Sequence, residues 1–347
     1  MKVQKASWPE RADKLAALLP VDQLHAEALA AALPERTSAG PWSVALSGGA
    51  DSVALLLLLW AHWPARRKHL RALHYNHRLR GRAADLDEEH CRKLCAALGI
   101  KLWVGRRKDD EPVQNENQAR ELRFAFIRRK MQQCRSRVLW LGHQQDDVAE
   151  TMLMRLARGS GSAGLAAPRP VHVQQGGSVH LRPLLTLKHG ELTAAMRAAG
   201  IVWREDRSNR GRDYFRNRIR HDVLPVWVQA ADRDAVAGAA LSRSLLAEDD
   251  EALEAWAECL QRQMPARRLK LDLLAAAPRA VVRRLLYRWL GQGPAVVLSR
   301  QAFEQLLAAV IRGDSTRQSL GHHVFAVIRR GELFCEIRAR GAKKRRD

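Results

Sequence analysis

From Trp42 onward, short apolar segments alternate with longer helical segments, and this alternation constrains the fold more than any other feature of the sequence. Strands are predicted at Val44–Leu46, Leu70–His74, Lys101–Val104 and Val138–Leu141. Helices are predicted between them, at Ser52–Trp63, Ala84–Leu98 and Glu116–Gln133. Strands that alternate with crossover helices indicate a parallel sheet with helices on both faces. We therefore predict an α/β, Rossmann-like domain, whose ligands bind at the carboxyl ends of the strands.

Changes in the sequence pattern divide the chain into three parts. Residues 1–38 are predicted to form a helical N-terminal extension, and residues 39–228 carry the α/β pattern. Residues 159–180, rich in Gly, Ser, Pro and Gln, are expected to form a mobile loop within that domain. Residues 229–347 are mainly helical and are predicted to end in a β-hairpin around Gly331, followed by a basic tail.

The charge balance favours a polyanionic partner. The 347 residues include 59 Lys and Arg against 37 Asp and Glu, a formal net charge of +22. Nucleic acid is the leading candidate partner, because neutralised phosphates release condensed counterions. An arginine-rich composition without such a partner is the alternative. The densest cluster comprises Arg204, Arg207, Arg210, Arg212, Arg216, Arg218 and Arg220.

Other classes of protein are excluded by composition. No apolar run approaches the roughly 18 residues of a membrane span. The polar first residues lack the apolar segment of a secretory signal, so we expect a cytoplasmic protein with no membrane partner. The five cysteines are an odd number, at too low a density for a disulfide scaffold, which fits a reducing compartment. The sequence leaves the oligomeric state open, with a homodimer among the options.

A glycine-rich loop follows the first predicted strand and opens the first helix. It consists of Ser47, Gly48, Gly49, Ala50, Asp51 and Ser52. Backbone N–H groups at a helix N-terminus bind anions, and glycine lets the backbone approach a phosphate closely. The lysine of a Walker loop and the G-x-G-x-x-G pattern are both missing. A turn with ordinary helix-starting residues is the alternative interpretation.

This loop resembles the pyrophosphate loop (PP-loop) of ATP pyrophosphatases, and further segments resemble the tRNA(Ile)-lysidine synthetases within that superfamily. Those segments are His74–Arg80, Glu116–Arg120 with Arg123, Leu141–Thr151, Arg158–Gly161, Arg182–Leu185, Glu205–Asp206 with Ser208–Asn209, and Arg216–Arg220. Their order and spacing cover roughly residues 42–226. The sequence departs from the family pattern at Gln144, where a second histidine is frequent, and at Val148, where glutamine is frequent.

The resemblance implies an ATP-dependent ligase, with residues 39–228 as a PP-loop ATP pyrophosphatase catalytic domain and residues 229–347 as a tRNA-recognition domain. Its reaction joins free L-lysine to C2 of the wobble cytidine in the CAU anticodon of isoleucine tRNA. An adenylated cytidine is the intermediate, and the product, lysidine, changes codon reading from AUG to AUA. ATP and Mg²⁺ are the implied cofactors. The alternatives are a related PP-loop tRNA thiolase, an amidating synthetase, or a non-catalytic tRNA-binding protein.

The same resemblance implies roles for individual residues. Residues 47–52 would bind ATP, and Asp51 would contact Mg²⁺. Asp147 and Glu150, three apart and so on one helix face, would hold lysine. Asp51, His143, Asp147 and Arg120 form the candidate catalytic set. The candidates for binding tRNA or the activated nucleotide are His77, Arg80, Glu116, Arg123, Arg216, Asn217 and Arg220. Each role has an alternative interpretation. In these alternatives the acids serve only to start helices, His143 serves only to pack or cap, and Arg216 and Arg220 form only a solvated basic face.

Overall fold

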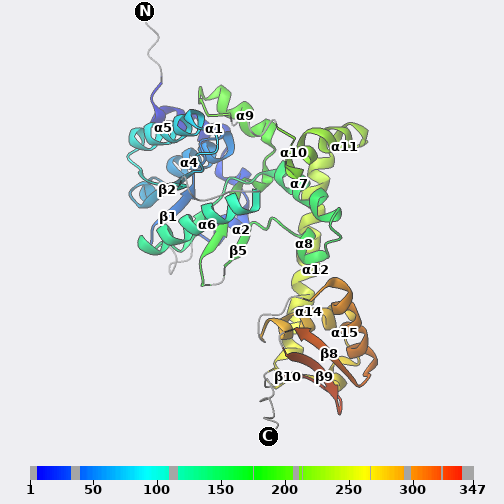
Figure 1. Cartoon of the computed structure of the whole chain (residues 1–347). Helices are drawn as coiled ribbons and strands as arrows, with labels where there is room; N and C mark the ends of the chain where they lie inside the picture. The colour runs from blue at the N-terminus through cyan, green and yellow to red at the C-terminus, as the bar shows by residue number, and fades with distance from the viewer. Residues whose placement is uncertain are drawn as a thin grey trace, which may run out of the picture. The chain divides into compact units, whose positions relative to one another are not determined.

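The computed structural model describes most of the chain. The described residues are 6–32, 40–108, 116–174, 176–205, 211–212, 214–265, 267–292, 298–321 and 323–337. The chain forms two compact units, residues 1–247 and 248–347 (Figure 1). The division falls within one long helix, α12 (Ala235–Gln261), whereas the sequence analysis drew a boundary at residue 229. The three-part domain assignment stays a prediction.

A six-stranded sheet forms the centre of the first unit, in the order β3-β2-β1-β4-β6-β5. Its strands are β1 (Trp42–Ala45), β2 (Leu70–Asn76), β3 (Lys101–Arg106), β4 (Val138–Trp140), β5 (Val171–Val173) and β6 (Val179–Leu181). All neighbouring pairs are parallel except β5 with β6. The predicted α/β class is therefore confirmed, and each of the four predicted strands is present.

The expected loop at residues 159–180 contains more regular structure than predicted. It includes α8 (Ser162–Leu165), β5 and the start of β6. β6 pairs with β4, since Val138 lies opposite Val179 and Trp140 opposite Leu181. The prediction of a loop was wrong here because strands of three residues carry too little side-chain pattern to be recognised. Local composition also does not reveal the pairing of β6 with the distant β4.

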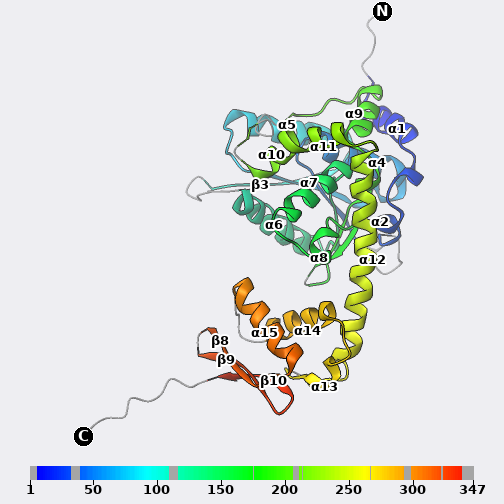
Figure 2. The same ribbon diagram turned by 90° about the vertical axis from the view of Figure 1, so that its right-hand side faces the viewer.

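Helices cover both faces of this sheet (Figures 1 and 2). On one face, α1 (Trp8–Leu18), α4 (Ala50–His62) and α9 (His189–Ala198) share a core with Val138 and Trp140. α5 (Arg82–Ala97) contributes to the same core. On the other face, α6 (Glu116–Gln133) packs Phe126 and Ile127 against Leu139. This separation follows from the strand period of two, which points successive side chains of β4 to opposite faces.

α4 is apolar all round because it is enclosed on every side. Residues 52–60 are all buried, and helix α1 packs over α4 with Ala12 and Leu15 buried in the same core. A helix that is hydrophobic on every face is stable only in such a buried position. The N-terminal helix is thus part of the core of the first unit. Near it are α2 (Ala26–Ala30) and the 3₁₀ turn Val21–Gln23.

Four further helical segments belong to the first unit. They are α7 (Gln145–Leu156), α10 (Phe215–Arg218), a π-helical turn (Ile219–Val223) and α11 (Leu224–Ala230). Ala149 of α7 packs with Leu224 of α11 and Val236 of α12. α10 and the π-turn directly precede α11 and both contact α7, so their side chains meet those of α7.

The second unit combines helices with an antiparallel sheet. Its helices are the end of α12, α13 (Leu271–Leu274), α14 (Arg279–Gly291) and α15 (Arg300–Arg312). Its strands are β7 (Leu269–Lys270), β8 (Thr316–Gly321), β9 (Val324–Arg329) and β10 (Glu332–Ile337), in the order β7-β10-β9-β8. The predicted hairpin is confirmed as β9 and β10. No helix in the described ranges is long and apolar enough to span a membrane.

Gly142 marks a point where two segments nearly touch, and this generates a stability prediction. A Cβ atom at this position would lie 2.8 Å from the backbone oxygen of Asp51. Gly142→Ala must therefore displace backbone, and we expect it to lower the free energy of unfolding by about 1–3 kcal/mol. Urea denaturation measures this change.

Gly238→Ala is the matched control, because nothing lies within 4 Å of a Cβ at that helical position. We expect it to be neutral or to stabilise by about 0.5–1 kcal/mol. Equal effects of the two substitutions would contradict the close approach at Gly142.

Candidate active site

The glycine-rich loop connects β1 to α4 and is braced by its own hydroxyl groups. The hydroxyl of Ser52 accepts from the N–H of Ser47 at 3.1 Å and donates to the carbonyl of Gly49 at 3.0 Å. The two serine hydroxyls lie 3.0 Å apart. α4 begins without a side-chain cap, so the N–H groups of its first turn are available to another acceptor. A phosphate matches such a helix terminus in charge and in hydrogen bonding.

Both the backbone conformation and the neighbouring atoms favour glycine at position 48. Its φ is +94°, a region that favours glycine, and a Cβ there would lie 3.3 Å from the sulfur of Cys91. Cys91 belongs to α5, which therefore packs directly beneath the loop. The shape of the loop thus depends on packing as well as on its own sequence.

Asp51 lies in the first turn of α4 and contacts a histidine that the sequence analysis missed. Its carboxylate is 3.1 Å from Nδ1 of His189, whose backbone N–H donates to Asp146 at 2.8 Å. Burial raises the pKa of Asp51, and the hydrogen bond from His189 opposes that rise. The same hydrogen bond raises the pKa of His189. His189 starts α9, 138 positions further along the chain, and no local pattern links it to the loop.

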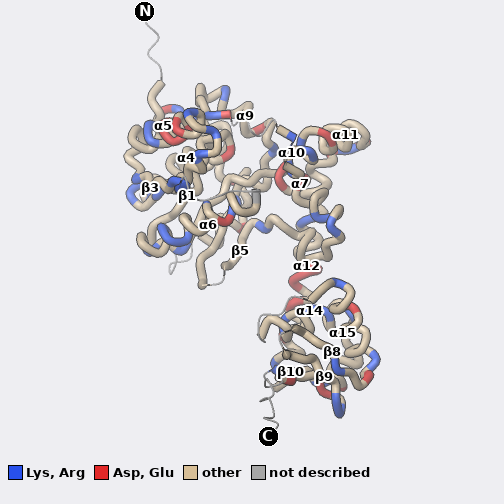
Figure 3. The backbone as a smooth tube through the Cα atoms, viewed as in Figure 1, with Lys and Arg blue, Asp and Glu red and all other residues tan. Residues whose placement is uncertain are grey.

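The two predicted lysine-binding acids, Asp147 and Glu150, are close together in α7 and both pair with arginines. Arg216 donates to Glu150 at 2.8 Å and to Asp147 at 2.6 Å. Arg220 donates to Glu150 at 2.5 and 3.0 Å, and its ion pair with Asp147 spans 3.6 Å. Figure 3 shows basic positions of α10 beside acidic positions of α7. The Glu150 side chain is only 1% exposed.

This network joins two sets of residues to which the sequence analysis gave separate roles. The arginines were predicted to bind nucleotide or tRNA phosphate, and the acids to bind lysine. Here each set neutralises the other, as buried charges require. Arg220 lies in the π-helical turn, a rare conformation that is frequent at functional sites. A cationic ligand can reach these acids only when the arginines withdraw.

His143 follows β4 and accepts a hydrogen bond from an arginine. Nε of Arg182 lies 3.1 Å from its Nδ1, so the proton of the neutral ring is on Nε2. Burial lowers the pKa of His143 well below its usual range, and the charges of Arg182 and Arg216 add to the effect. Arg120 and Arg123 also act on His143, and each lies over the ring of Phe124. A neutral histidine among arginines suits an anionic or nucleotide ligand.

The loop after β2 carries two more predicted residues, His77 and Arg80. Burial and the nearby Arg123 lower the pKa of His77 to about 4. Arg80 donates to the buried Asp87 of α5 at 2.9 Å. Asp87 also accepts from Arg204 at 2.9 Å, and the N–H of Arg204 donates to the carbonyl of Gly48 at 3.0 Å. The sequence analysis gave Asp87 no role, because its partners come from segments distant in sequence.

The structure thus brings most predicted site residues to one edge of the sheet, although their roles stay predictions. Asn217 is buried beside the network, whereas the side chain of Glu116 lies outside the described residues. Gln144 caps α7 by accepting from Asp146, and Val148 is fully buried. Both departures from the family pattern therefore have structural roles. Within the described ranges, no group of three or more His, Cys, Asp or Glu side chains is arranged to hold a metal.

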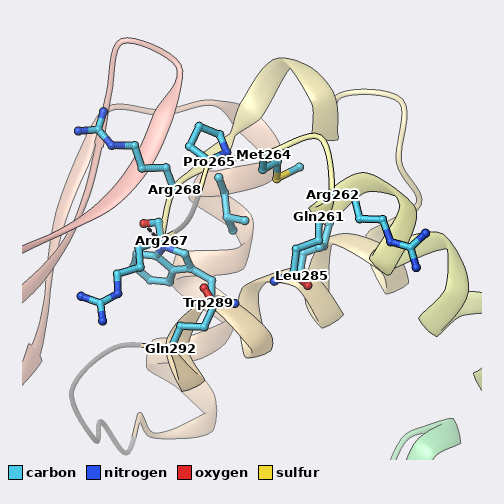
Figure 4. Close-up of a pocket in the computed structure, with 10 residues that line it drawn as sticks. Gln261, Arg262, Met264, Pro265, Arg267, Arg268, Leu285, Trp289 and Gln292 are labelled. Atoms are coloured by element: carbon cyan, nitrogen blue, oxygen red, sulfur yellow. Dashed lines mark hydrogen bonds between the residues drawn. The ribbon is translucent and has the colours of Figure 1, made fainter.

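The second unit has a cavity of its own, of about 570 Å³ (Figure 4). Trp289 and Leu285 line it together with Arg262, Arg267 and Arg268. The guanidinium groups of Arg262 and Arg268 extend to opposite sides of the view and do not converge on the cavity. It contains none of the predicted site residues, so it does not add to the candidate active site.

Comparison with known proteins assigns a class to this fold and loop. Residues 22–227 match the PP-loop domain, which makes the first unit a PP-loop ATP-binding domain. The tRNA(Ile)-lysidine synthase of Geobacter sulfurreducens is 37% identical over 257 residues, 71% of this chain and 53% of the relative. That of Alkalilimnicola ehrlichii is 35% identical over 315 residues, 87% of this chain and 67% of the relative. The chain belongs to the tRNA(Ile)-lysidine synthase family.

Two further facts define the extent of the similarity. The chain spans about half the length of several of these relatives, including the synthase of Clostridium acetobutylicum at 46%. The solved U34-tRNA thiolase NcsA from Methanococcus maripaludis, with its [4Fe-4S] cluster, has a similar fold, with a TM-score of 0.51 and 17% identity. That match covers 64% of this chain and 77% of the thiolase, and it supports the fold alone.

Buried histidines in this unit generate a prediction about pH. Burial lowers the pKa of His180, and nearby Arg182 adds to the effect, to about 4. Below pH about 6.5 the unfolded chain binds protons that the folded chain does not, so stability falls as the pH falls from 6.5 towards 4. We expect His180→Gln to reduce the slope of unfolding free energy against pH by up to about 1.4 kcal/mol per pH unit. Denaturant titrations between pH 5 and 7 measure this slope.

His69→Gln is the control, because this exposed side chain stays in water when the chain folds. An unchanged slope in His180→Gln would contradict the lowered pKa of His180. His189, whose pKa is raised, contributes to the slope in the opposite sense near and above pH 6.5. It is present in the wild-type protein and in the variant, so its contribution cancels when the two slopes are compared.

Proposed function

We propose that this chain attaches free L-lysine to C2 of the wobble cytidine of isoleucine tRNA with a CAU anticodon, using ATP. The observation that carries the proposal is the uncapped start of α4, with Asp51 in its first turn, next to a buried pair of acids on α7. An anion site for phosphates and an acidic site for an amine are the two elements that such a ligation needs.

The chemistry has two steps. In the first, O2 of cytidine attacks the α-phosphorus of ATP, the bond to the β-phosphate breaks, and pyrophosphate leaves. In the second, the ε-amine of lysine attacks C2, the C2–O bond breaks with AMP as leaving group, and the amine loses a proton. Oxide is a poor leaving group, so adenylation is what makes the exchange possible. The N–H groups at the start of α4 stabilise the charge on the phosphates.

Asp51 fits a contact to Mg²⁺. Magnesium needs only one or two protein carboxylates, because phosphates and water supply the other ligands. Burial without a cation disfavours the ionised carboxylate, which is consistent with the raised pKa of Asp51. A bound Mg²⁺ would neutralise charge on the phosphates of ATP.

Asp147 and Glu150 are the proposed lysine site, and the paired arginines connect this site to the first substrate. When phosphates or an adenylate arrive, Arg216 and Arg220 have a new anionic partner. Their withdrawal leaves two carboxylates without counter-charge, which favours an ammonium group in their place. This exchange supports an order with adenylation first and lysine second.

The buried cysteines weigh against a thiolase. Burial raises the pKa of Cys91 far above its usual range and that of Cys95 to about 12, so both stay protonated at neutral pH. The thiolate is the reactive form of cysteine, and these two side chains lack it.

Transfer of radiolabelled lysine tests the proposal directly. The protein is incubated with ATP, Mg²⁺ and isoleucine tRNA bearing CAU, in parallel with methionine tRNA bearing the same anticodon. We expect label in the isoleucine tRNA alone. Label in neither tRNA, with binding retained, would identify a non-catalytic tRNA-binding protein instead.

Asp51→Asn separates catalysis from binding in the same assay. Loss of the charge should abolish adenylation, measured as pyrophosphate release, while affinity for tRNA stays within about twofold because Asp51 faces the phosphates of ATP. The control is Asp13→Asn, since Asp13 is exposed on α1 and lies 4.0 Å from Arg67. A strong loss of tRNA binding in Asp51→Asn would contradict the assigned role.

The arginine network predicts that lysine alone binds poorly. Equilibrium dialysis with radiolabelled lysine should show weak binding to the free protein and at least tenfold tighter binding once ATP and tRNA are present. Arg216→Met removes one competing cation and should tighten binding to the free protein. Equal lysine affinity with and without the other substrates would refute this competition.

A further inference from the structure

A groove of about 1100 Å³ lies beside the glycine-rich loop. One wall is the start of α5 with the residues just before it, and the other is the segment from the end of α9 to Glu205. Both helices cover the same face of the sheet as α4 (Figure 1). The groove lies outside the network of Asp147, Glu150, Arg216 and Arg220. Of its lining residues, only Arg80 has a role predicted from the sequence, in binding tRNA or the activated nucleotide.

The groove is held in a fixed position next to the loop. Arg204, in one wall, donates its N–H to Gly48 at 3.0 Å. The carboxylate of Asp87 accepts from Arg204 and from Arg80, which lies in the opposite wall, at 2.9 Å each. This buried carboxylate therefore ties the two walls together and fixes two guanidinium groups.

The other arginines of the groove remain available to a ligand. Arg82 and Arg197 form no ion pair with any residue that the structure describes. Together with Arg80 and Arg204, which share Asp87, they make four cationic side chains in the lining, against the carboxylates of Glu205 and Asp87. The charge of the groove therefore matches a polyanion.

Apolar and aromatic surface lies between these charges. The guanidinium carbon of Arg197 lies over the ring of Trp203, 5.5 Å from its centroid, which is the geometry of a cation–π pair. Leu86 is 40% exposed and Val202 is 65% exposed. Large apolar side chains exposed beside unpaired arginines indicate a binding surface. A ligand with phosphates and flat bases satisfies both features, whereas a simple anion satisfies only one.

We propose that this groove binds single-stranded RNA, with phosphates at Arg82 and Arg197 and a base against Trp203 and Val202. The inference rests on the proposed function and extends it, because the nucleotides next to the modified cytidine are single-stranded in an anticodon loop. Arginine and aromatic side chains are the usual partners of phosphates and unstacked bases. The groove then guides the loop so that its cytidine reaches the glycine-rich loop.

The test measures binding of an RNA hairpin with the sequence of the isoleucine anticodon stem and loop. Arg82→Ala and Arg197→Ala should each weaken binding about threefold to tenfold. Each should also reduce the slope of log affinity against log salt concentration by about 0.7, the value for one phosphate contact of a single strand. Fluorescence anisotropy gives both quantities. Val202→Glu, which adds a negative charge to an exposed position, should weaken binding without removing a cation.

Arg137→Ala is the matched control. Arg137 is exposed just before β4, and so at the opposite edge of the sheet from the glycine-rich loop. It should leave both affinity and salt slope unchanged. If Arg82→Ala and Arg197→Ala behave like this control, the groove does not bind RNA and the proposal fails. A raised Michaelis constant for ATP with unchanged RNA binding would assign the groove to the nucleotide instead and would also overturn it.

Lysine transfer separates this proposal from the proposed function. If the wild-type protein binds the hairpin through the groove but transfers no lysine, the RNA surface stands and the ligase assignment fails. If the wild-type protein transfers lysine and the groove variants bind and react normally, the ligase stands and the groove proposal fails.

Discussion

The position of β1 between two parallel neighbours is the constraint on which the site depends. β1 pairs with β2 on one side and β4 on the other, all in the same direction. The carboxyl ends of the three strands therefore meet at one edge, where the loops that follow them converge. Gly142 follows β4 so closely over the start of α4 that only a glycine fits against Asp51. The glycine-rich loop and the acidic helix α7 are neighbours for this reason.

The charges at this edge are compensated within the chain. Asp147 and Glu150 would be costly to bury alone, and so would Arg216 and Arg220, which are mostly buried. The ion pairs between the acids and the arginines offset both costs of burial without a ligand. In the proposed function, a substrate would compete with an internal partner, so that binding of one substrate would change the sites available to the next. Arg220, one of the two arginines that pair with these acids, lies in the π-helical turn, an irregular backbone conformation that is frequent at functional sites.

A second network connects the glycine-rich loop to the proposed RNA groove. Asp87 bonds two arginines from different segments, and one of them bonds the backbone of Gly48. Hydrogen bonds thus join both walls of the groove to the loop. The two networks share no residue, which separates the handling of lysine from the handling of RNA in this interpretation.

Local patterns were enough to predict much of the protein. The alternation of apolar runs with helices determined the α/β class, the four strands and the final hairpin, because side-chain period and turn residues are local properties. The loop at residues 47–52 and the acids of α7 were recognisable for the same reason, since each lies within one turn of chain. The strands β5 and β6 were not, because strands of three residues carry too little side-chain pattern, and β6 joins the sheet through the distant β4.

Only the tertiary structure decided which charges meet. Nothing in the sequence pairs Arg216 with Glu150, His189 with Asp51, or Asp87 with Arg204, because their separations of 66, 138 and 117 positions exceed any local period. The sequence by itself determined the elements and the kinds of side chain at their ends. Packing of the helices on the two faces of the sheet determined the distances between those side chains, and such distances decide ionisation and binding.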